Sequence, residues 1–212
     1  MEPSHLEAPA PRIPPTRRLP RTVFAVDSDD DAALMQAYAQ GDARAFERLY
    51  VRHKGPLYRY LVRQSRDREI ANDLFQETWS RVVSSRARYQ QRAKFQTFLY
   101  TIAHNCFVDH CRRSAVRPIA NDEVDAEQFV TAPASDGPQI QAERAELRDR
   151  YRAALLELPG EQRDVFLLYE ESGLSLEEIG QITGVSMETA KSRLRYAVAK
   201  LRSALEYEAS LS

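Results

Sequence analysis

Hydrophobic residues recur at helical spacing through most of the first half of the chain. Between Asp31 and Arg113, apolar side chains fall three or four positions apart, which is the period of a helix with one buried face. This pattern predicts several helices, with Asp67 as an N-cap and a last helix over about 95–113. Its members are Ala33, Leu34, Ala37, Tyr38, Ala45, Phe46, Leu49, Tyr50, Leu57, Leu61, Ile70, Leu74, Phe95, Phe98, Leu99, Ile102 and Cys106.

A second helical pattern occupies the C-terminal part of the chain. It predicts a helix from near Gln141 that carries Leu147, Tyr151 and Leu155 and stops at Pro159. A shorter helix over 161–171 should end at Gly173, because glycine is the preferred residue after a helix. Between the two patterns, residues 114–140 contain three prolines and no sustained apolar period, which predicts a flexible linker.

The last two helices have the sequence signature of a helix-turn-helix. Ser175 and Glu178 form a capping box, Gly184 supplies the turn, and Ser186 caps the second helix. The early turns of such a second helix enter the major groove of duplex DNA. A pair of ordinary surface helices is the alternative interpretation, but it does not explain why the capping box, the glycine turn and a basic second helix coincide. The candidate DNA contacts are Glu188, Thr189, Lys191, Ser192, Arg193, Arg195 and Tyr196, with Arg193 better suited to a phosphate than to a base.

Charge is segregated along the chain, although its sum is close to neutral. The 212 residues are 43% hydrophobic and 29% charged, with 7 Gly and a net charge of −1, which suits a mainly helical protein. From Arg81 to Arg117, eight basic residues face a single acid, Asp109, whereas acidic residues concentrate in 27–31 and 122–149. A second basic segment is the last helix, with Lys191, Arg193, Arg195, Lys200 and Arg202. The two basic segments flank an acidic connector, a pattern that favours nucleic-acid binding by the basic segments.

Several function classes are disfavoured by the sequence. No apolar run approaches the roughly 20 residues of a membrane span, and the start of the chain lacks the apolar core of a secretory signal. We therefore expect a cytoplasmic protein without membrane insertion. Residues 1–26 are rich in Pro and Arg, and we expect them to form a disordered leader. Phosphate-binding loops and nucleophile elbows are missing, so we predict no catalytic residues, no cofactor and no enzymatic activity.

A zinc site is suggested by four residues of one predicted helix, His104, Cys106, His110 and Cys111. At 100° per residue, His104 and Cys111 share one face of the helix, whereas Cys106 and His110 point to nearly the opposite face. Four ligands on opposite faces cannot converge on one ion, so we predict no metal.

Aromatic and basic residues alternate in the segment that precedes the last helix of the first half. Rings can stack on unpaired bases while Arg and Lys hold the phosphates, so residues 86–94 are candidates for binding single-stranded DNA. Phe95 and Phe98 have the spacing of core residues, which leaves Tyr89 and Tyr100 as the candidate stacking rings.

Three segments of the chain resemble the extracytoplasmic-function sigma factors of bacterial RNA polymerase. Residues 73–79, Asp-Leu-Phe-Gln-Glu-Thr-Trp, are similar to the region-two helix that docks on the clamp helices of the β′ subunit. Residues 95–105 resemble the promoter-melting segment of the same region. Residues 158–205 resemble region four, including the Lys-Ser-Arg stretch at 191–193.

The resemblance implies an all-α fold with two small helical domains and a division of labour between them. Region two, over 27–113, would bind core polymerase and the unstacked minus-ten element. Region four, over 141–212, would bind the minus-thirty-five duplex and the β flap, and residues 114–140 would be the flexible acidic linker. An anti-sigma factor is the usual further partner in this family. Carried over by position, the polymerase contacts are Asp73, Leu74, Gln76, Glu77 and Arg81, and the minus-ten contacts are Arg86, Arg88, Tyr89, Arg92, Lys94 and Asn105.

Two other interpretations remain open from the sequence. A conventional helix-turn-helix activator or repressor would bind duplex DNA tightly by itself, often at a palindrome. A protein that only sequesters a partner would not need the basic recognition face. A sigma factor instead predicts weak duplex binding alone and promoter opening only with core polymerase.

Overall fold

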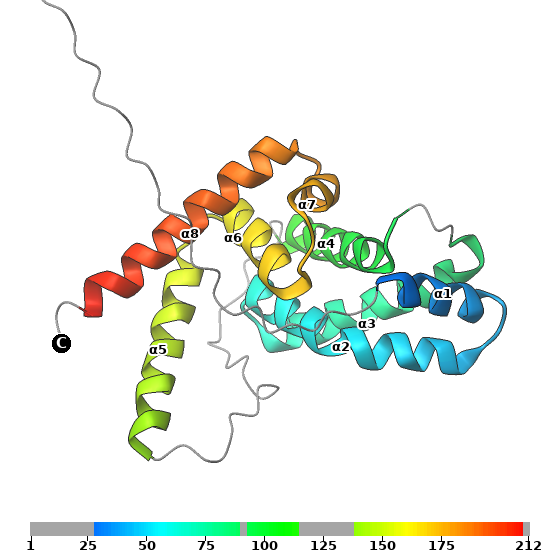
Figure 1. The fold of residues 1–212 in the computed structure, drawn as a ribbon, viewed down its shortest axis with the longest axis horizontal. Coiled ribbons are helices and arrows are strands. Elements are labelled where there is room, and N and C mark those ends of the chain that lie inside the picture. The colour runs from blue at the N-terminus through cyan, green and yellow to red at the C-terminus, as the bar shows by residue number, and fades with distance from the viewer. Residues whose placement is uncertain (1–27, 90–92, 115–137, 210–212) are drawn as a thin grey trace, which may run out of the picture.

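The computed structural model describes residues 28–89, 93–114 and 138–209, and these residues form helices without any strand. The predicted all-α fold class is therefore confirmed (Figure 1). The N-terminal helices are α1 (Ser28–Ala39), α2 (Ala43–Ser65), α3 (Arg68–Ser85), the 3-10 turn η1 (Arg86–Arg88) and α4 (Phe95–Ser114). The C-terminal helices are α5 (Pro138–Leu156), α6 (Gly160–Leu167), the π-helical turn η2 (Leu168–Ser172), α7 (Leu176–Thr183) and α8 (Met187–Ala209).

Aspartate caps fix the starts of α2 and α3. The Asp42 carboxylate accepts a hydrogen bond from the Arg44 amide at 2.9 Å, and Asp67 accepts from the amide of Glu69 at 2.8 Å. The predicted Asp67 cap is confirmed. Between these caps, α2 runs without interruption through Pro56 and ends at Ser65. The C-cap residue that follows, Arg66, has a left-handed φ of 63°.

The C-terminal helices pack around α8. Ile179 and Ile182 of α7 are buried with Ala190 and Ala197 of α8, as the predicted helix-turn-helix requires. Among the described side chains of α5, only Ala154 and Leu155 are buried, and the N-terminal half of this helix extends away from the other helices in Figure 1. Leu147, which the hydrophobic pattern includes, is consequently 54% exposed.

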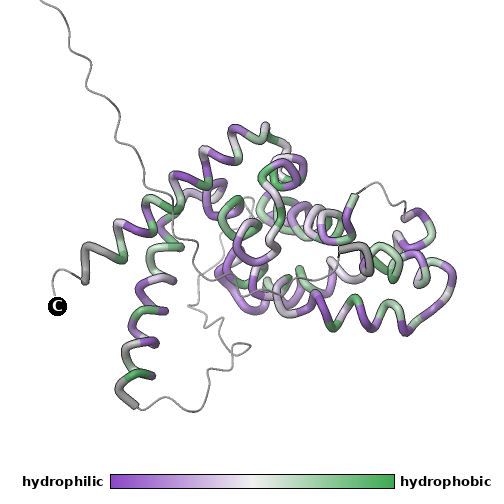
Figure 2. The backbone as a smooth tube through the Cα atoms, viewed as in Figure 1, coloured by the Kyte–Doolittle hydropathy of each residue, from purple (hydrophilic) through white to green (hydrophobic). Residues whose placement is uncertain are grey.

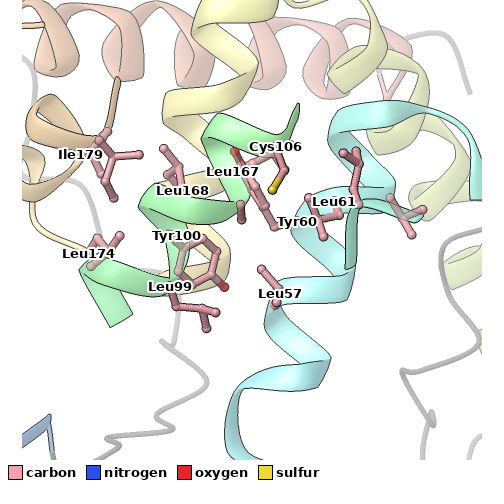
Figure 3. Close-up of a cluster of buried hydrophobic side chains, with 14 of the residues drawn as sticks. Leu57, Tyr60, Leu61, Leu99, Tyr100, Cys106, Leu167, Leu168, Leu174 and Ile179 are labelled. Carbon is pink, nitrogen blue, oxygen red and sulfur yellow. The ribbon is translucent and has the colours of Figure 1, made fainter. Parts of the chain in front are cut away.

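A single hydrophobic core joins the N-terminal and the C-terminal helices. Figure 3 shows side chains of α2 and α4 packed against side chains of α6, η2 and α7. Their apolar atoms are excluded from water, which is the main favourable term in holding helices together. The labelled members are Leu57, Tyr60, Leu61, Leu99, Tyr100, Cys106, Leu167, Leu168, Leu174 and Ile179. The sequence did not predict this contact between the two halves.

The predicted leader over 1–26 and most of the predicted linker lie outside the described residues. The ends of the predicted linker are helical, because α4 continues to Ser114 and α5 already begins at Pro138. The division into two domains at the predicted boundaries stays a prediction.

Hydrophilic and hydrophobic residues are interleaved along α5 and α8, as Figure 2 shows. Within the described part of the chain, every helix is too short or too polar to cross a lipid bilayer.

Candidate nucleic-acid interface

The helix-turn-helix is held by a capping box at the start of α7 and by close backbone contact in the turn that follows α7. The Ser175 hydroxyl accepts a hydrogen bond from the Glu178 amide at 3.3 Å, and the Glu178 carboxylate accepts one from the Ser175 amide at 2.9 Å. Gly184 has a φ of 71°, which glycine adopts without strain. A Cβ at Gly180 would lie 2.8 Å from the Val185 carbonyl oxygen, so only glycine fits at this position. The capping box and the glycine turn predicted from the sequence are both confirmed.

The early turns of α8 present a polar face to solvent. Ser186 caps the helix by accepting a hydrogen bond from the Thr189 amide at 3.1 Å. Thr189, Tyr196 and most of the other predicted contacts are exposed. The candidate base-reading side chains converge on a shallow hollow of about 130 Å³, which is lined by Glu188, Lys191, Ser192 and Arg195. A small hollow ringed by donors and acceptors suits the edges of base pairs in a major groove.

Two other cations of α8 contact the neighbouring helices. Arg193 forms an ion pair with Glu161 at the start of α6, and the Lys200 ammonium donates to the Glu157 carbonyl at 2.7 Å. Both side chains therefore help to hold α8 in place, and the expectation that Arg193 contacts a phosphate rather than a base stays a prediction.

An open cleft of about 600 Å³ lies between η1 and the first turns of α4. The Tyr89 ring packs edge-on against Phe98, with ring centroids 5.3 Å apart. The Tyr89 hydroxyl is enclosed but has no hydrogen-bond partner among the described residues. Burial, followed by the negative charge of Asp31, raises the pKa of Tyr89, so this hydroxyl stays a neutral donor. The lining residues are Ser85, Arg88, Tyr89, Ala93, Thr97, Phe98, Thr101 and Gln181.

The cleft brings together two of the predicted minus-ten contacts, and the structure corrects one prediction of a stacking ring. Arg88 and Tyr89 line it, and exposed Asn105 lies one turn of α4 beyond Thr101. Tyr100, also proposed to stack on bases, is 1% exposed and packs edge-on against Tyr60 in the core, so that prediction is wrong. Its neighbours on α4 place it on the buried face.

The remaining cations of this group have separate surroundings. The Arg86 guanidinium lies 5.5 Å from the centre of the Tyr38 ring, and exposed Lys94 lies beside Glu178 of α7. Arg92 lies outside the described residues.

Sequence reasoning missed the α4 side of the cleft. Thr97, Phe98 and Thr101 line it, although Phe98 has the spacing of a core residue. The signal was available, because Thr97 and Thr101 are polar residues four apart and therefore share one helical face.

The candidate polymerase-binding residues of α3 are mostly exposed. Asp73, Gln76 and Arg81 face solvent, and Arg81 pairs with half-buried Glu77 at 2.6 Å. Leu74 is 2% exposed and packs in the N-terminal core, so it supports the helix and cannot itself contact a partner.

The residues that suggested zinc are dispersed in the fold. The His104 ring nitrogen Nδ1 lies 2.9 Å from the Asp164 carboxylate, Cys106 is buried, and Cys111 is exposed as a free thiol. Among the described residues, no three His, Cys, Asp or Glu side chains form a group that could hold a metal ion.

Comparison with known proteins identifies both halves of the chain. The family model of sigma-70 region 2 matches residues 49–117, and that of sigma-70 region 4 matches residues 148–201. RNA polymerase sigma factor CarQ of Myxococcus xanthus is 34% identical over 81% of this chain and 95% of its own length. The ECF RNA polymerase sigma factor SigE of Mycolicibacterium smegmatis is 34% identical over 86% of this chain and 71% of its own length.

Two solved structures have the same fold. CnrH in complex with the cytosolic domain of CnrY is 24% identical, covers 84% of this chain and 99% of its own, and has a TM-score of 0.62. The sigma factor RpoE in complex with the anti-sigma factor NepR from Bartonella quintana is 22% identical, covers 77% of this chain and 98% of its own, and has a TM-score of 0.61.

Proposed function

The chain belongs to the extracytoplasmic-function sigma factors of the sigma-70 family, and on that premise we propose how its surfaces divide the work of transcription initiation. The N-terminal helices bind core RNA polymerase and the unstacked minus-ten strand, and α8 binds the minus-thirty-five duplex. Catalysis belongs to the polymerase partner.

The observation that carries this proposal is that one chain has two surfaces of different shape and chemistry, a cleft and a hollow on a helix. The cleft at Tyr89 and Phe98 offers ring faces, the Arg88 cation and an enclosed hydroxyl, which are the groups that hold an unstacked base. The hollow on α8, by contrast, is a polar surface on a protruding helix that fits a groove. A repressor needs only the second surface.

Promoter melting follows from the first surface. A base captured in the cleft is withdrawn from its stack, and the interactions of its ring and phosphate offset the cost of unpairing, a few kcal/mol per base. Exposed Arg86, Lys94 and Asn105 extend the basic surface beyond the cleft along the path of the strand.

The exposed face of α3 is the proposed polymerase contact. Asp73, Gln76, Glu77 and Arg81 combine both charge signs with an amide on two successive helical turns, as suits a polar and specific protein interface. We also propose an anti-sigma factor as a partner, since two solved structures with this fold are complexes, one of them named with an anti-sigma factor.

In vitro transcription with core polymerase tests the proposal. The protein is added to core enzyme on promoter fragments, each supplied as intact duplex and as a template with a pre-melted bubble. Transcripts should appear only when protein and core are both present, and the bubble should reduce the dependence on the minus-ten contacts. Absence of core recruitment and of transcripts on every template would refute the sigma function.

Duplex binding without polymerase separates the proposal from the alternative regulator. A sigma factor should bind promoter duplex weakly by itself. Tight, sequence-specific binding of the protein alone to a palindromic duplex would instead support a conventional activator or repressor.

A further inference from the structure

We propose that a buried polar pair, Asp31 of α1 and His53 of α2, positions the aromatic rings of the single-strand cleft. Neither residue is among the described side chains that line the cleft, so both act on DNA only through the rings. They are therefore positioning residues for strand capture. This inference rests on the proposed function of the cleft.

Asp31 and His53 meet in the interior, between the first turn of α1 and the middle of α2. The His53 ring nitrogen Nε2 lies 2.7 Å from one oxygen of the Asp31 carboxylate, which is hydrogen-bonding distance. The Arg52 guanidinium pairs with the other oxygen. Asp31 is 3% exposed and His53 is 4% exposed, so water competes little for these contacts. Both oxygens of the carboxylate are held by α2, which fixes the start of α1 against that helix.

A buried carboxylate is a costly way to hold two helices together. Its removal from water opposes the attraction to its partners, and apolar side chains of similar volume often give equal stability. What the polar contact adds is direction, because a hydrogen bond is strong only over a narrow range of distances and angles. The contact between Asp31 and His53 therefore defines the place of the His53 ring more sharply than apolar packing would.

Three ring contacts lead from His53 to the cleft. The centre of the His53 ring lies 5.3 Å from that of Phe95, which is fully buried at the start of α4. The Phe95 ring lies 6.3 Å from that of Phe98, and the Phe98 ring lies 5.3 Å from that of Tyr89. Phe98 and Tyr89 line the cleft. Because close-packed rings cannot shift independently, a displacement of His53 reaches the two rings that we propose to stack on a base.

The η1 side of the cleft also depends on α1. The Arg86 guanidinium of η1 lies 5.5 Å from the centre of the Tyr38 ring, within the range of a cation–π contact. Tyr38 is buried on α1, about two turns beyond Asp31. Burial and then the negative charge of Asp31 raise the pKa of Tyr89, so this carboxylate lies close enough to influence a ring of the cleft. The helix that Asp31 fixes thus supports both walls of the cleft.

The test compares how the holoenzyme binds single-stranded and duplex promoter DNA. Holoenzyme is formed from the full-length protein and core polymerase. One probe is a fluorescent oligonucleotide with the non-template strand of the minus-ten element of a promoter that the wild type transcribes. The other probe is a duplex that contains only the minus-thirty-five element of that promoter. Both dissociation constants are measured for the wild type and for each variant.

The main variant combines Asp31→Asn with His53→Phe. It keeps the size of both side chains and an oxygen that can accept from Arg52, but the bond between positions 31 and 53 is lost. Affinity for the single strand should fall about tenfold, the order of the loss of one contact between a ring and a base. Affinity for the duplex should not change. Equal weakening of both probes would overturn the proposal.

Two single substitutions separate the links of this argument. Asp31→Asn alone keeps an acceptor for the His53 ring nitrogen, so it should retain the single-strand affinity of the wild type within about twofold. His53→Gln keeps a donor for Asp31 but lacks the ring that contacts Phe95, so it should lose single-strand affinity. This second variant decides the question if the double variant does not fold. Wild-type affinity in His53→Gln would refute the path through the rings.

Val62→Ala is a matched control in the same helix. Val62 is 3% exposed, and the loss of its buried methyl groups should destabilise the fold without changing single-strand affinity. A loss as large as that of the double variant would mean that general stability, and not positioning, determines strand capture.

The wild type distinguishes failure of this inference from failure of the proposed function. If wild-type holoenzyme binds the oligonucleotide no better than one of scrambled sequence, the single-strand function of the cleft is refuted, and the inference with it. If it prefers the promoter strand and the double variant and His53→Gln bind that strand equally well, positioning alone is refuted.

A spectroscopic measurement on the free protein reads the cleft ring itself. Fluorotyrosine is incorporated at position 89, and its fluorine resonance reports the surroundings of that ring. The combined Asp31→Asn, His53→Phe variant should shift or broaden the resonance, whereas Val62→Ala should leave it in place. An identical resonance in the wild type and the double variant would overturn the proposal.

Discussion

Arg193 and Arg195 are two residues apart on α8 but have different neighbours. Arg193 is three-quarters buried against Glu161, whereas Arg195 is exposed at the hollow with its guanidinium 5.3 Å from the centre of the Tyr196 ring. The aromatic ring limits the freedom of the guanidinium at little cost in hydrogen bonding, and we therefore propose that Arg195 contacts a base edge.

Arg195→Ala should therefore weaken discrimination at the minus-thirty-five element. We expect a loss of about 1–3 kcal/mol between matched and mismatched sequences, the usual value of a base-reading arginine. The measurement is open-complex formation by the holoenzyme on promoters with single changes in that element. Arg193→Ala is the comparison and should lower binding to all sequences by a similar factor. Equal losses on all sequences for Arg195→Ala would assign it to a phosphate.

At the residue scale, the N-caps of helices were easier to predict from the sequence than the functional roles of single side chains. Asp67, Ser175 and Ser186 were placed correctly because a cap depends only on the next three residues. Tyr100 and Leu74 were misassigned because both lie in motifs whose other members are exposed, and only packing decides which way each side chain points.

The α7–turn–α8 element depends on how closely its turn approaches the first helix. The Val185 amide donates to the Gly180 carbonyl at 2.9 Å, and the Val185 carbonyl leaves no space for a side chain on Gly180. The turn thus sets the angle at which α8 projects from the molecule.

Gly180→Ala should destabilise the protein. The added methyl group meets backbone, which cannot rotate away, and overpacking of this kind costs about 1–3 kcal/mol. Urea unfolding measures the loss. Gly160→Ala is a matched control at the start of α6, where a Cβ would meet nothing within 4 Å, and it should change stability by less than about 0.5 kcal/mol. Equal stabilities of the two variants would show that the turn can widen.

At the element scale, the end of a helix was easier to predict than a change in helix type. The hydrophobic period predicted the helix over 161–171 and its end at Gly173, which is left-handed as expected. It did not predict the change to a π-helical turn at Leu168, because one extra residue in a turn alters no apolar spacing outside it.

At the scale of the whole molecule, the contact of Glu178 with Thr97 and Lys94 joins the C-terminal to the N-terminal helices. The stability that this contact contributes depends on pH. Burial tends to raise the pKa of Glu178, but hydrogen bonds from Ser175 and Thr97 and the charge of Lys94 outweigh it, so the pKa lies below its ordinary value of 4.5. A depressed pKa in the folded state means that the carboxylate stabilises this state above about pH 4.5. That stabilisation is lost as the pH falls through the folded pKa.

Comparing the unfolding free energies of wild type and Glu178→Gln across pH tests this dependence. At pH 7 the wild type should be more stable by about 1 kcal/mol, the upper range for a partly exposed ion pair. The difference should shrink as the pH falls below 4.5, because the wild-type side chain then loses its charge. The comparison cancels the other carboxylates, which titrate in both proteins. A difference independent of pH would mean that the charge of Glu178 contributes nothing.

The arrangement of the whole molecule could not be predicted from the sequence. The pair of Tyr60 with Asp164 joins residues 104 positions apart, and that of Arg59 with Glu171 joins residues 112 apart. Periodicity reports which face of a helix is buried, but not which distant helix covers it. The family resemblance implied two domains on a flexible linker, and such an arrangement gives no reason to expect contacts between the domains.

The cleft at Tyr89 and the hollow on α8 also differ in the state of the DNA that each can meet. Gln181 of α7 lines the cleft together with Tyr89, whereas the hollow lies on the early turns of α8. Under the proposed function, an intact chromosome therefore offers a ligand to α8 alone, and the cleft gains one only where the duplex opens.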